Sequence, residues 1–251
     1  MTEPATQHTR YLDALIGLVE RVRDEEADGL AEAAARIVDA LERGNELFAF
    51  GCSHSSLPVQ DIYYRAGGLM LVNPIFAPGL ASLDTRPPTL GSDMEQLEGY
   101  ADVVLDNSPL GAGDVLIVVS VSGRNPVPVE MAASARERGA IVIGLTSRTY
   151  SGAVTSRHSS GRKMADFADV VLDNKVDTGD AVLESEGVAQ RYAPASGVTS
   201  TALLHALMAA TVEGLVQRGI TPPVFLGANV DGGAEYNARL LEEHGDRIHY
   251  M

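Results

Sequence analysis

The chain has 251 residues, 45% of them apolar, and its 34 acidic and 19 basic residues give a formal net charge of −15. That charge argues against nucleic acids and anionic membrane surfaces as partners, but it does not exclude a small anion, which responds to local N–H groups. A single cysteine excludes an internal disulfide and suits a reducing cytosol, and neither a signal peptide nor 18 consecutive apolar residues is present. We therefore expect a soluble, cytoplasmic protein.

Hydrophobic periodicity and helix-ending residues predict alternating helices and strands. Helices are expected at residues 4–27, 30–43, 58–66, 93–100, 126–138, 200–218 and 234–244, and strands at 46–50, 69–72, 115–119, 141–147 and 170–172. Residues 73–92 are rich in proline and glycine, and a connection of that length is often functional. The peptide ADVVLDN occurs twice, at 101–107 and 168–174, as a duplicated half-domain or by coincidence.

The strand at 115–119 is the centre of the predicted fold. It is apolar at every position, as expected for a central strand of a parallel sheet that is covered on both faces. Ser120, Ser122 and Gly123 follow it, and Pro126 then opens a helix. Hydroxyl groups and a helix N-terminus at one strand end form a natural site for an anion such as phosphate. A Walker lysine is absent and G-x-G-x-x-G is not the pattern, so a nucleotide is not indicated.

Three strand ends together resemble the SIS (sugar isomerase) domain, which binds phosphosugars. S-V-S-G-R-N at 120–125 is similar to the family's S-x-S-G-x-[TSN], C-S-H-S-S at 52–56 resembles its first loop, and I-V-I-G-L-T-S at 141–147 resembles its I-x-I-T strand end. The resemblance spans about residues 30–173. It is closest to a group with a GCSHS-like first loop and a YRAGG segment, here residues 64–68. Relatives of known activity include phosphoheptose isomerases and N-acetylmuramic acid 6-phosphate etherases.

The resemblance implies an α/β fold, namely a three-layer αβα sandwich with a five-stranded parallel sheet of the flavodoxin-like or Rossmann-like kind. We expect a single SIS domain over residues 1–251. It comprises N-terminal helices at 1–44, a sheet core at 45–175 and C-terminal helices at 196–245. The early helices of this family often pack against a second subunit, so a homodimer or a dimer of dimers is expected.

The predicted phosphosugar-binding residues follow the strand ends, where ligands of open parallel sheets bind. They are Ser53, Ser55, Ser120, Ser122, Gly123, Arg124, Asn125, Thr146 and Ser147. The serines bind phosphate or serve only as turn and cap residues, and we favour phosphate because three junctions agree. Arg124 either pairs with the phosphate or faces water. Cys52 is interpreted as a small turn residue and not as a nucleophile.

Four residues are candidates for acid–base catalysis. His54 lies in the first loop, Glu95 follows the 73–92 segment where etherases place a glutamate, and Asp61 lies on the helix after the first loop. His205 on the long C-terminal helix is either catalytic or a core histidine. Phosphoheptose isomerases carry a histidine near Asp61 and a glutamate near Arg65 that serve a metal, and etherases also have the glutamate. This chain has neither, so we expect no metal and no cofactor.

Two classes of function remain open. The first is an enzyme of amino-sugar metabolism, in which a carboxylate removes the C2 proton of N-acetylglucosamine 6-phosphate or a close N-acetylhexosamine 6-phosphate and the C3 oxygen departs. Aldose–ketose isomerisation begins with the same abstraction. The second is a phosphosugar sensor without turnover. A sugar phosphate is the expected small-molecule partner in both.

Overall fold

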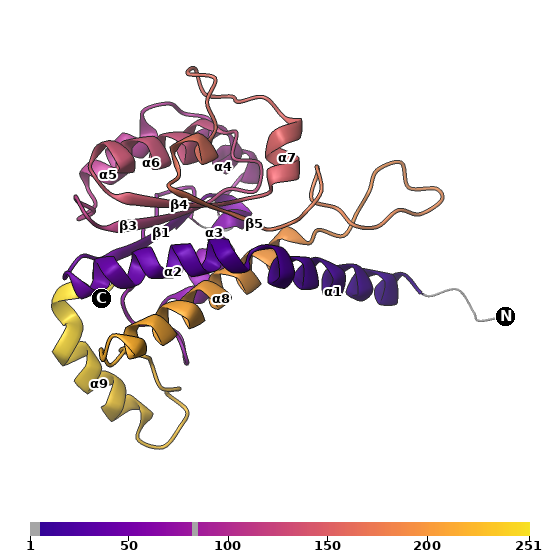
Figure 1. Ribbon diagram of the computed structural model, residues 1–251. Helices are drawn as coiled ribbons and strands as arrows, with labels where there is room; N and C mark the ends of the chain where they lie inside the picture. Colours follow the sequence, from indigo (N-terminus) through magenta and orange to yellow (C-terminus); the bar gives the residue numbers. More distant parts are fainter. Residues whose placement is uncertain (1–5, 82–84) are drawn as a thin grey trace.

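The computed structural model describes residues 6–81 and 85–251, in which five parallel strands form one sheet (Figure 1). The strands are β1 (Leu47–Gly51), β2 (Val72–Pro74), β3 (Val115–Val119), β4 (Ile141–Thr146) and β5 (Val170–Asp173). The helices are α1 (Gln7–Glu25), α2 (Ala27–Glu42), α3 (Ser56–Ile62), α4 (Pro88–Met94), α5 (Tyr100–Asp106), α6 (Pro126–Glu137), α7 (Arg148–Ala153), α8 (Ser196–Gln217) and α9 (Gly233–His244). Short 3-10 turns are η1 (Ser53–Ser55), η2 (Met164–Phe167) and η3 (Gly245–Arg247).

The strand order is β2-β1-β3-β4-β5, with every neighbouring pair parallel. β1 and β3 are in register from Leu47 opposite Val115 to Gly51 opposite Val119, so both strands end at the same edge. All five residues of β3 are buried, as expected for a central strand covered on both faces. The predicted α/β class and the five-stranded parallel sheet are confirmed.

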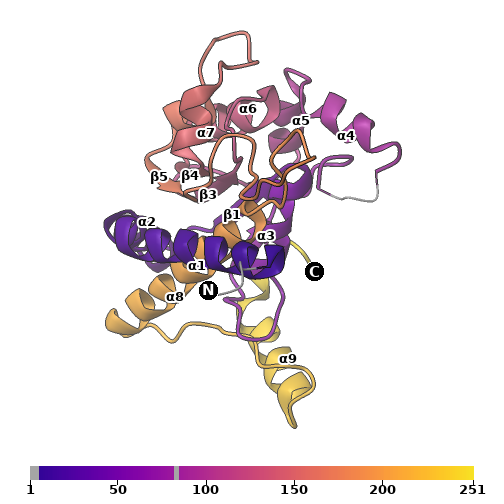
Figure 2. The same cartoon turned by 90° about the vertical axis from the view of Figure 1, so that its right-hand side faces the viewer.

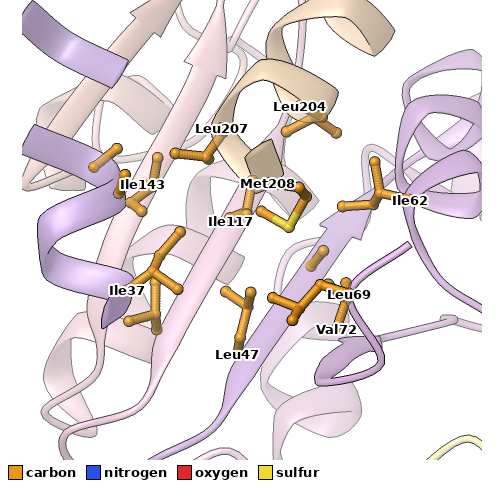
Figure 3. Close-up of a cluster of buried hydrophobic side chains, with 14 of the residues drawn as sticks. Ile37, Leu47, Ile62, Leu69, Val72, Ile117, Ile143, Leu204, Leu207 and Met208 are labelled. Atoms are coloured by element: carbon orange, nitrogen blue, oxygen red, sulfur yellow. The ribbon is translucent and has the colours of Figure 1, made fainter. Parts of the chain in front are cut away.

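Helices cover both faces of the sheet and make it the middle layer of three (Figures 1 and 2). α2, α3 and α8 lie on one face, and α5 and α6 lie on the other. Side chains of β3 alternate between the two layers. Ile117 belongs to the core beneath α2 and α8, which Figure 3 shows, and Leu116 and Val118 belong to the core beneath α5 and α6. Burial of one such side chain contributes roughly 1.5–3 kcal/mol, so both layers hold the central strand.

The long helix α8 is apolar enough to be compared with a membrane span. Its length and composition satisfy that test, and 44% of its most apolar 18-residue window is buried inside the protein. Leu204, Leu207 and Met208 pack between α2 and α3 (Figure 3). A core helix of an α/β sandwich explains the same composition.

A buried ion cluster joins the break between α1 and α2 to the end of β5. The Lys175 ammonium lies 2.5 Å from a Glu26 oxygen and 3.4 Å from an Asp173 oxygen, and all three side chains are less than 10% exposed. The Asp173 N–H donates to the other Glu26 oxygen at 3.0 Å. Burial lowers the pKa of Lys175, but hydrogen bonds to Glu26 and Glu25 outweigh it and the net pKa is raised. The ammonium therefore stays charged.

Several predicted elements were wrong. The second strand was expected at 69–72, but it runs from Val72 to Pro74, because Leu69 instead forms an antiparallel bridge with Val224. The expected helix at 93–100 is replaced by α4, α5 and a break at Gly99, which has a φ of +85°. α4 begins inside the segment 73–92 and ends beyond it at Met94, and α7 had not been predicted. The predicted start of the first helix at residue 4 and part of the 73–92 segment, at 82–84, lie outside the described residues.

Candidate functional site

A cleft of about 620 Å³ lies beyond the carboxyl ends of β1 and β3. Its lining comes from six parts of the chain: the loop after β1 with the start of α3, the loop after β3, the turn after α4, α7, the loop after β5, and the residues around the start of α8. The lining residues are Cys52, Ser53, His54, Ser55, Leu57, Pro58, Glu95, Ser120, Val121, Ser122, Tyr150, Gly179, Asp180, Pro194, Ser196, Gly197, Val198 and Ser200. None of these residues is lysine or arginine, so hydroxyl groups, backbone N–H groups and the His54 imidazole are the donors that the described lining offers to an anion.

The loop after β1 is tightly folded. A Cβ at Gly51 would lie 2.2 Å from the Ser55 carbonyl oxygen, which only glycine avoids. Ser53 has a φ of +51°, in the left-handed region, and its N–H donates to the Leu80 carbonyl at 2.7 Å. The Ser56 hydroxyl donates to the Ser53 carbonyl at 2.6 Å. These bonds fix the backbone, so Ser53, His54 and Ser55 are presented to the cleft in one arrangement.

Only some of the predicted phosphosugar-binding residues in the loop after β3 line the cleft. Ser120 and Ser122 line the cleft, whereas Gly123, Arg124 and Asn125 are not among its lining residues. The Gly123 carbonyl accepts from the Met164 N–H at 2.9 Å and the Arg124 carbonyl from the Arg157 N–H at 2.8 Å, so this backbone is joined to the α7–η2 connection. Their role in binding stays a prediction.

Thr146 and Ser147 are fully buried and use their hydroxyl groups within the fold. Thr146 Oγ1 donates to the Val121 carbonyl at 2.9 Å, and Ser147 Oγ donates to the Val176 carbonyl at 2.6 Å. Ser147 also caps α7 by accepting from the Tyr150 N–H at 2.9 Å. Both residues hold neighbouring loops in place, and direct contact with a sugar stays a prediction.

Glu95 places a carboxyl group in the cleft at the end of α4. Its N–H donates to the Gly91 carbonyl and its carbonyl accepts from the Val127 N–H, at 3.0 and 3.1 Å, so its backbone is tied to both α4 and α6. Burial raises the pKa of Glu95, and the Asn125 amide and the Arg157 charge reduce that increase without removing it. A carboxylate with a raised pKa is a stronger base than an exposed one, which suits proton abstraction.

Cys52 and His54 occupy the cleft in different ways. The Cys52 thiol is buried, and burial together with the nearby Glu95 charge holds its pKa well above the usual value. It is therefore a protonated thiol and a poor nucleophile, in line with its interpretation as a small turn residue. His54 is exposed on the short 3-10 turn, where its imidazole reaches the cleft.

Asp61 and His205 come together, but they are not among the residues that line the cleft. His205 Nε2 lies 2.8 Å from one Asp61 oxygen, and Arg65 Nη1 lies 2.6 Å from the other. The three side chains are each more than 40% exposed and connect α3 to α8. A catalytic role for this pair stays a prediction that its position does not support.

Tyr150, Asp180 and Ser196 line the cleft but were missed in the sequence. Asp180 Oδ1 accepts from the backbone N–H groups of Ala195 and Ser196, at 3.0 and 2.7 Å, and its other oxygen accepts from the Ser196 hydroxyl. It thereby stabilises the start of α8 beside the cleft. Nothing in the sequence placed the start of α8 next to the β1 and β3 loops.

One cluster in residues 6–81 and 85–251 has the composition of a metal site. The ligand atoms of Glu98, Glu130 and His158 lie within 4.8 Å of one another, outside the cleft lining. Glu98 already accepts from the Ser159 N–H and hydroxyl, and both Glu130 oxygens accept from the Gly99 N–H. The cluster fastens the α7–η2 connection to the turn between α4 and α5.

Comparisons with known proteins agree on a family and a fold. The family model described as SIS domain matches residues 10–147. A UPF0309 protein of Streptomyces griseus is 52% identical over 241 residues, covering 96% of each chain, and one of Listeria innocua is 39% identical, covering 95% of this chain and 96% of the other.

Solved structures give the same fold at lower identity. A phosphoheptose isomerase from Neisseria gonorrhoeae is 18% identical with a TM-score of 0.57, covering 82% of this chain and 97% of that one. The Vibrio vulnificus NanR protein complexed with ManNAc-6P is 12% identical with a TM-score of 0.51, covering 97% and 70%.

Proposed function

Because the chain belongs to the SIS domain family, we propose that the cleft beyond β1 and β3 binds a sugar phosphate and acts on it as an enzyme. The observation that carries this proposal is the meeting of two serine-bearing strand ends and one carboxyl group of raised pKa in a single cleft. Proteins of this fold include phosphoheptose isomerases and a NanR protein complexed with ManNAc-6P, so the fold accommodates the proposed ligand class.

The phosphate group occupies the serine end of the cleft. Ser53, Ser55, Ser120 and Ser122 offer hydroxyl donors there, and the loop of Ser53–Ser55 is rigid before the ligand arrives. Rigid donors lose little conformational entropy on binding. This arrangement explains how a protein with a net charge of −15 takes an anion without a lysine or arginine among the described lining residues.

The sugar end faces Glu95, which serves as the base in the proposed reaction. In an open-chain N-acetylhexosamine 6-phosphate the C1 aldehyde acidifies the C2 proton, and the Glu95 carboxylate accepts that proton as an enolate forms. The C2=C3 double bond then forms as the C3–O bond breaks, and a second acid, for which His54 is placed, gives a proton to the departing hydroxide so that water leaves. The overall reaction is a dehydration that needs no metal, nucleotide or external oxidant.

Aldose–ketose isomerisation is the alternative reaction at the same groups, because it begins with the same proton transfer to Glu95. The proton then returns to C1 and the C3–O bond stays intact. A sensor would bind the sugar phosphate without either step.

Proton NMR in deuterium oxide separates these alternatives. Wild-type protein is incubated with N-acetylglucosamine 6-phosphate, and the C2 proton signal is followed beside that of Glu95→Gln and of Glu137→Gln, an acid at the end of α6 that does not line the cleft. We expect loss of the C2 signal and a new alkene signal with wild type and Glu137→Gln only. A ketose product would make the protein an isomerase, and binding with an unchanged spectrum would contradict enzymatic turnover.

A homodimer is part of the same proposal and is supported by α1. Leu12, Ile16 and Val19 lie on one face of this helix and are 55%, 58% and 36% exposed in the single chain. A second subunit packed against this face would bury these apolar side chains. Light scattering should report a dimer for wild type and for Asp13→Lys, and a monomer for Ile16→Glu. A wild-type monomer at micromolar concentration would contradict this part of the proposal.

A further inference from the structure

Ser200 is a cleft residue that the proposed reaction does not use. It lies on the second turn of α8, lines the cleft and is only 1% exposed. Its hydroxyl oxygen accepts a hydrogen bond from the Asn174 Nδ2 at 3.0 Å. A hydroxyl group also has one proton to donate. Residues 6–81 and 85–251 provide no hydrogen-bond acceptor for that proton, so the Ser200 hydroxyl can donate to a ligand in the cleft.

Asn174 fixes the direction of this hydrogen bond. The Asn174 Oδ1 accepts from the Val176 N–H at 3.4 Å, so the amide oxygen faces the backbone and the Nδ2 is left to donate to Ser200. Asn174 is fully buried, and its own N–H donates to the Thr146 carbonyl at 2.9 Å. Because the Asn174 Nδ2 engages a lone pair of the Ser200 oxygen, the Ser200 proton must point away from Asn174.

The N-terminus of α8, in the same wall of the cleft, is already occupied by a carboxylate of the protein. Asp180 accepts from the N–H groups of Ala195 and Ser196, at 3.0 and 2.7 Å, and from the Ser196 hydroxyl. The Ala195 carbonyl accepts from the N–H groups of Val198 and Thr199, both at 3.1 Å. Asp180 thus lies where a bound anion would be stabilised by the helix, and its negative charge repels a phosphate group.

The two walls of the cleft therefore differ in what they can bind. The loops after β1 and β3 offer serine hydroxyl groups and carry no carboxylate, whereas the α8 wall carries Asp180 and the hydroxyl proton of Ser200. Placing a phosphate beside a fixed negative charge is unfavourable, but an uncharged oxygen meets no such repulsion. The phosphate is expected at the two loops, and the sugar is expected at α8.

We propose that Ser200 donates a hydrogen bond to an uncharged oxygen of the sugar, a hydroxyl or carbonyl group, and that Asn174 is the positioning residue that directs the Ser200 hydroxyl toward it. The proposal rests on the proposed function and adds the orientation of the ligand in the cleft. A buried donor without an acceptor is unfavourable, so the Ser200 hydroxyl selects ligands that present an oxygen at this wall.

Two probes separate the phosphate from the sugar. N-acetylglucosamine 6-phosphate is titrated into wild type and Ser200→Ala by calorimetry, and inorganic phosphate is titrated by phosphorus-31 NMR. We expect Ser200→Ala to weaken binding of the sugar phosphate by about 2- to 13-fold, the effect of one hydrogen bond between uncharged groups, and to leave the affinity for inorganic phosphate unchanged. Thr211→Val is the matched control, because it removes a fully buried hydroxyl from the same helix outside the cleft lining and should change neither affinity.

A double-mutant cycle tests the role of Asn174. Asn174→Leu removes the amide that orients the Ser200 hydroxyl, so it should weaken binding of N-acetylglucosamine 6-phosphate in the wild type but cause no further loss in Ser200→Ala. The same further loss in both backgrounds would show that Asn174 only supports the fold, and it would overturn the positioning role.

The remaining outcomes distinguish this inference from the proposed function. A Ser200→Ala variant with wild-type affinity for N-acetylglucosamine 6-phosphate would overturn the contact with the sugar, and an equal loss of affinity for both probes would overturn the proposed orientation. A wild-type protein that binds neither probe would overturn the proposed function, and this inference with it.

Discussion

Gly51 is the position at which one added methyl group most directly disturbs the proposed site. A Cβ there would lie 2.2 Å from the carbonyl oxygen and 2.6 Å from the carbonyl carbon of Ser55, and real Cβ contacts are essentially never below 3.0 Å. The gap must therefore open by at least 0.8 Å, the difference between 3.0 and 2.2. The obstacle is backbone whose N–H is bonded to the Cys52 carbonyl at 2.9 Å, so no flexible side chain can move aside.

We expect Gly51→Ala to cost about 1–3 kcal/mol of unfolding free energy, as overpacked cores do. A displacement of about 1 Å in the loop of Ser53–Ser55 should weaken binding or turnover of a sugar phosphate by about 100-fold. Urea unfolding and titration calorimetry measure the two effects. Gly152→Ala in α7 is the control, because nothing lies within 4 Å of its added Cβ. Wild-type binding by Gly51→Ala would refute the reasoning.

Two further predictions concern buried charges. Lys175→Met leaves Glu26 and Asp173 buried without their cation and should lower the unfolding free energy in urea by about 3–5 kcal/mol. Arg218→Met, which breaks an exposed pair with Asp39, should cost no more than about 1 kcal/mol, and equal losses would contradict the role of burial. Because the pKa of Glu95 is raised in the folded protein, its stabilising contribution is present at acid pH and is lost as pH rises through that pKa. Glu95→Gln should therefore be more stable than wild type at pH 8 and lose this advantage at pH 4; a variant less stable at pH 8 would contradict the raised pKa.

The repeated peptide ADVVLDN marks the limit of what local sequence could predict. Its first copy forms most of α5, and its second copy runs from the end of η2 into β5. The first follows Gly99, whose φ of +85° and bond to Glu130 start a helix against α6. In the second, Asp169 accepts from the Val142 N–H of β4 and the Asp173 N–H donates to Glu26. These partners are remote in sequence, so tertiary contacts decide between helix and strand.

The central strands and the proximity of the two serine loops were predictable for a physical reason. Strands such as β3 are apolar on both faces, and the ends of parallel neighbours meet at one edge. Glu95 was a candidate because etherases, which the chain resembles, place a glutamate after the segment that precedes β3. Asp180 was missed because it lies in the cleft only through its contact with the start of α8, which is remote in sequence from the β1 and β3 loops. Thr146 was predicted to bind the ligand because it lies at a strand end, but its sequence position did not reveal that its hydroxyl donates to the Val121 carbonyl.

Titration calorimetry of N-acetylglucosamine 6-phosphate tests the central claim most directly. The account predicts that the phosphorylated sugar binds, that the same sugar without phosphate does not, and that Ser120→Ala weakens binding by about 10- to 150-fold, the equivalent of one hydrogen bond to a charged group at about 1.5–3 kcal/mol. Ser134→Ala, on α6 and outside the cleft lining, should bind as the wild type does. Equal binding with and without phosphate, or an unchanged affinity in Ser120→Ala, would contradict a phosphate site at the ends of β1 and β3.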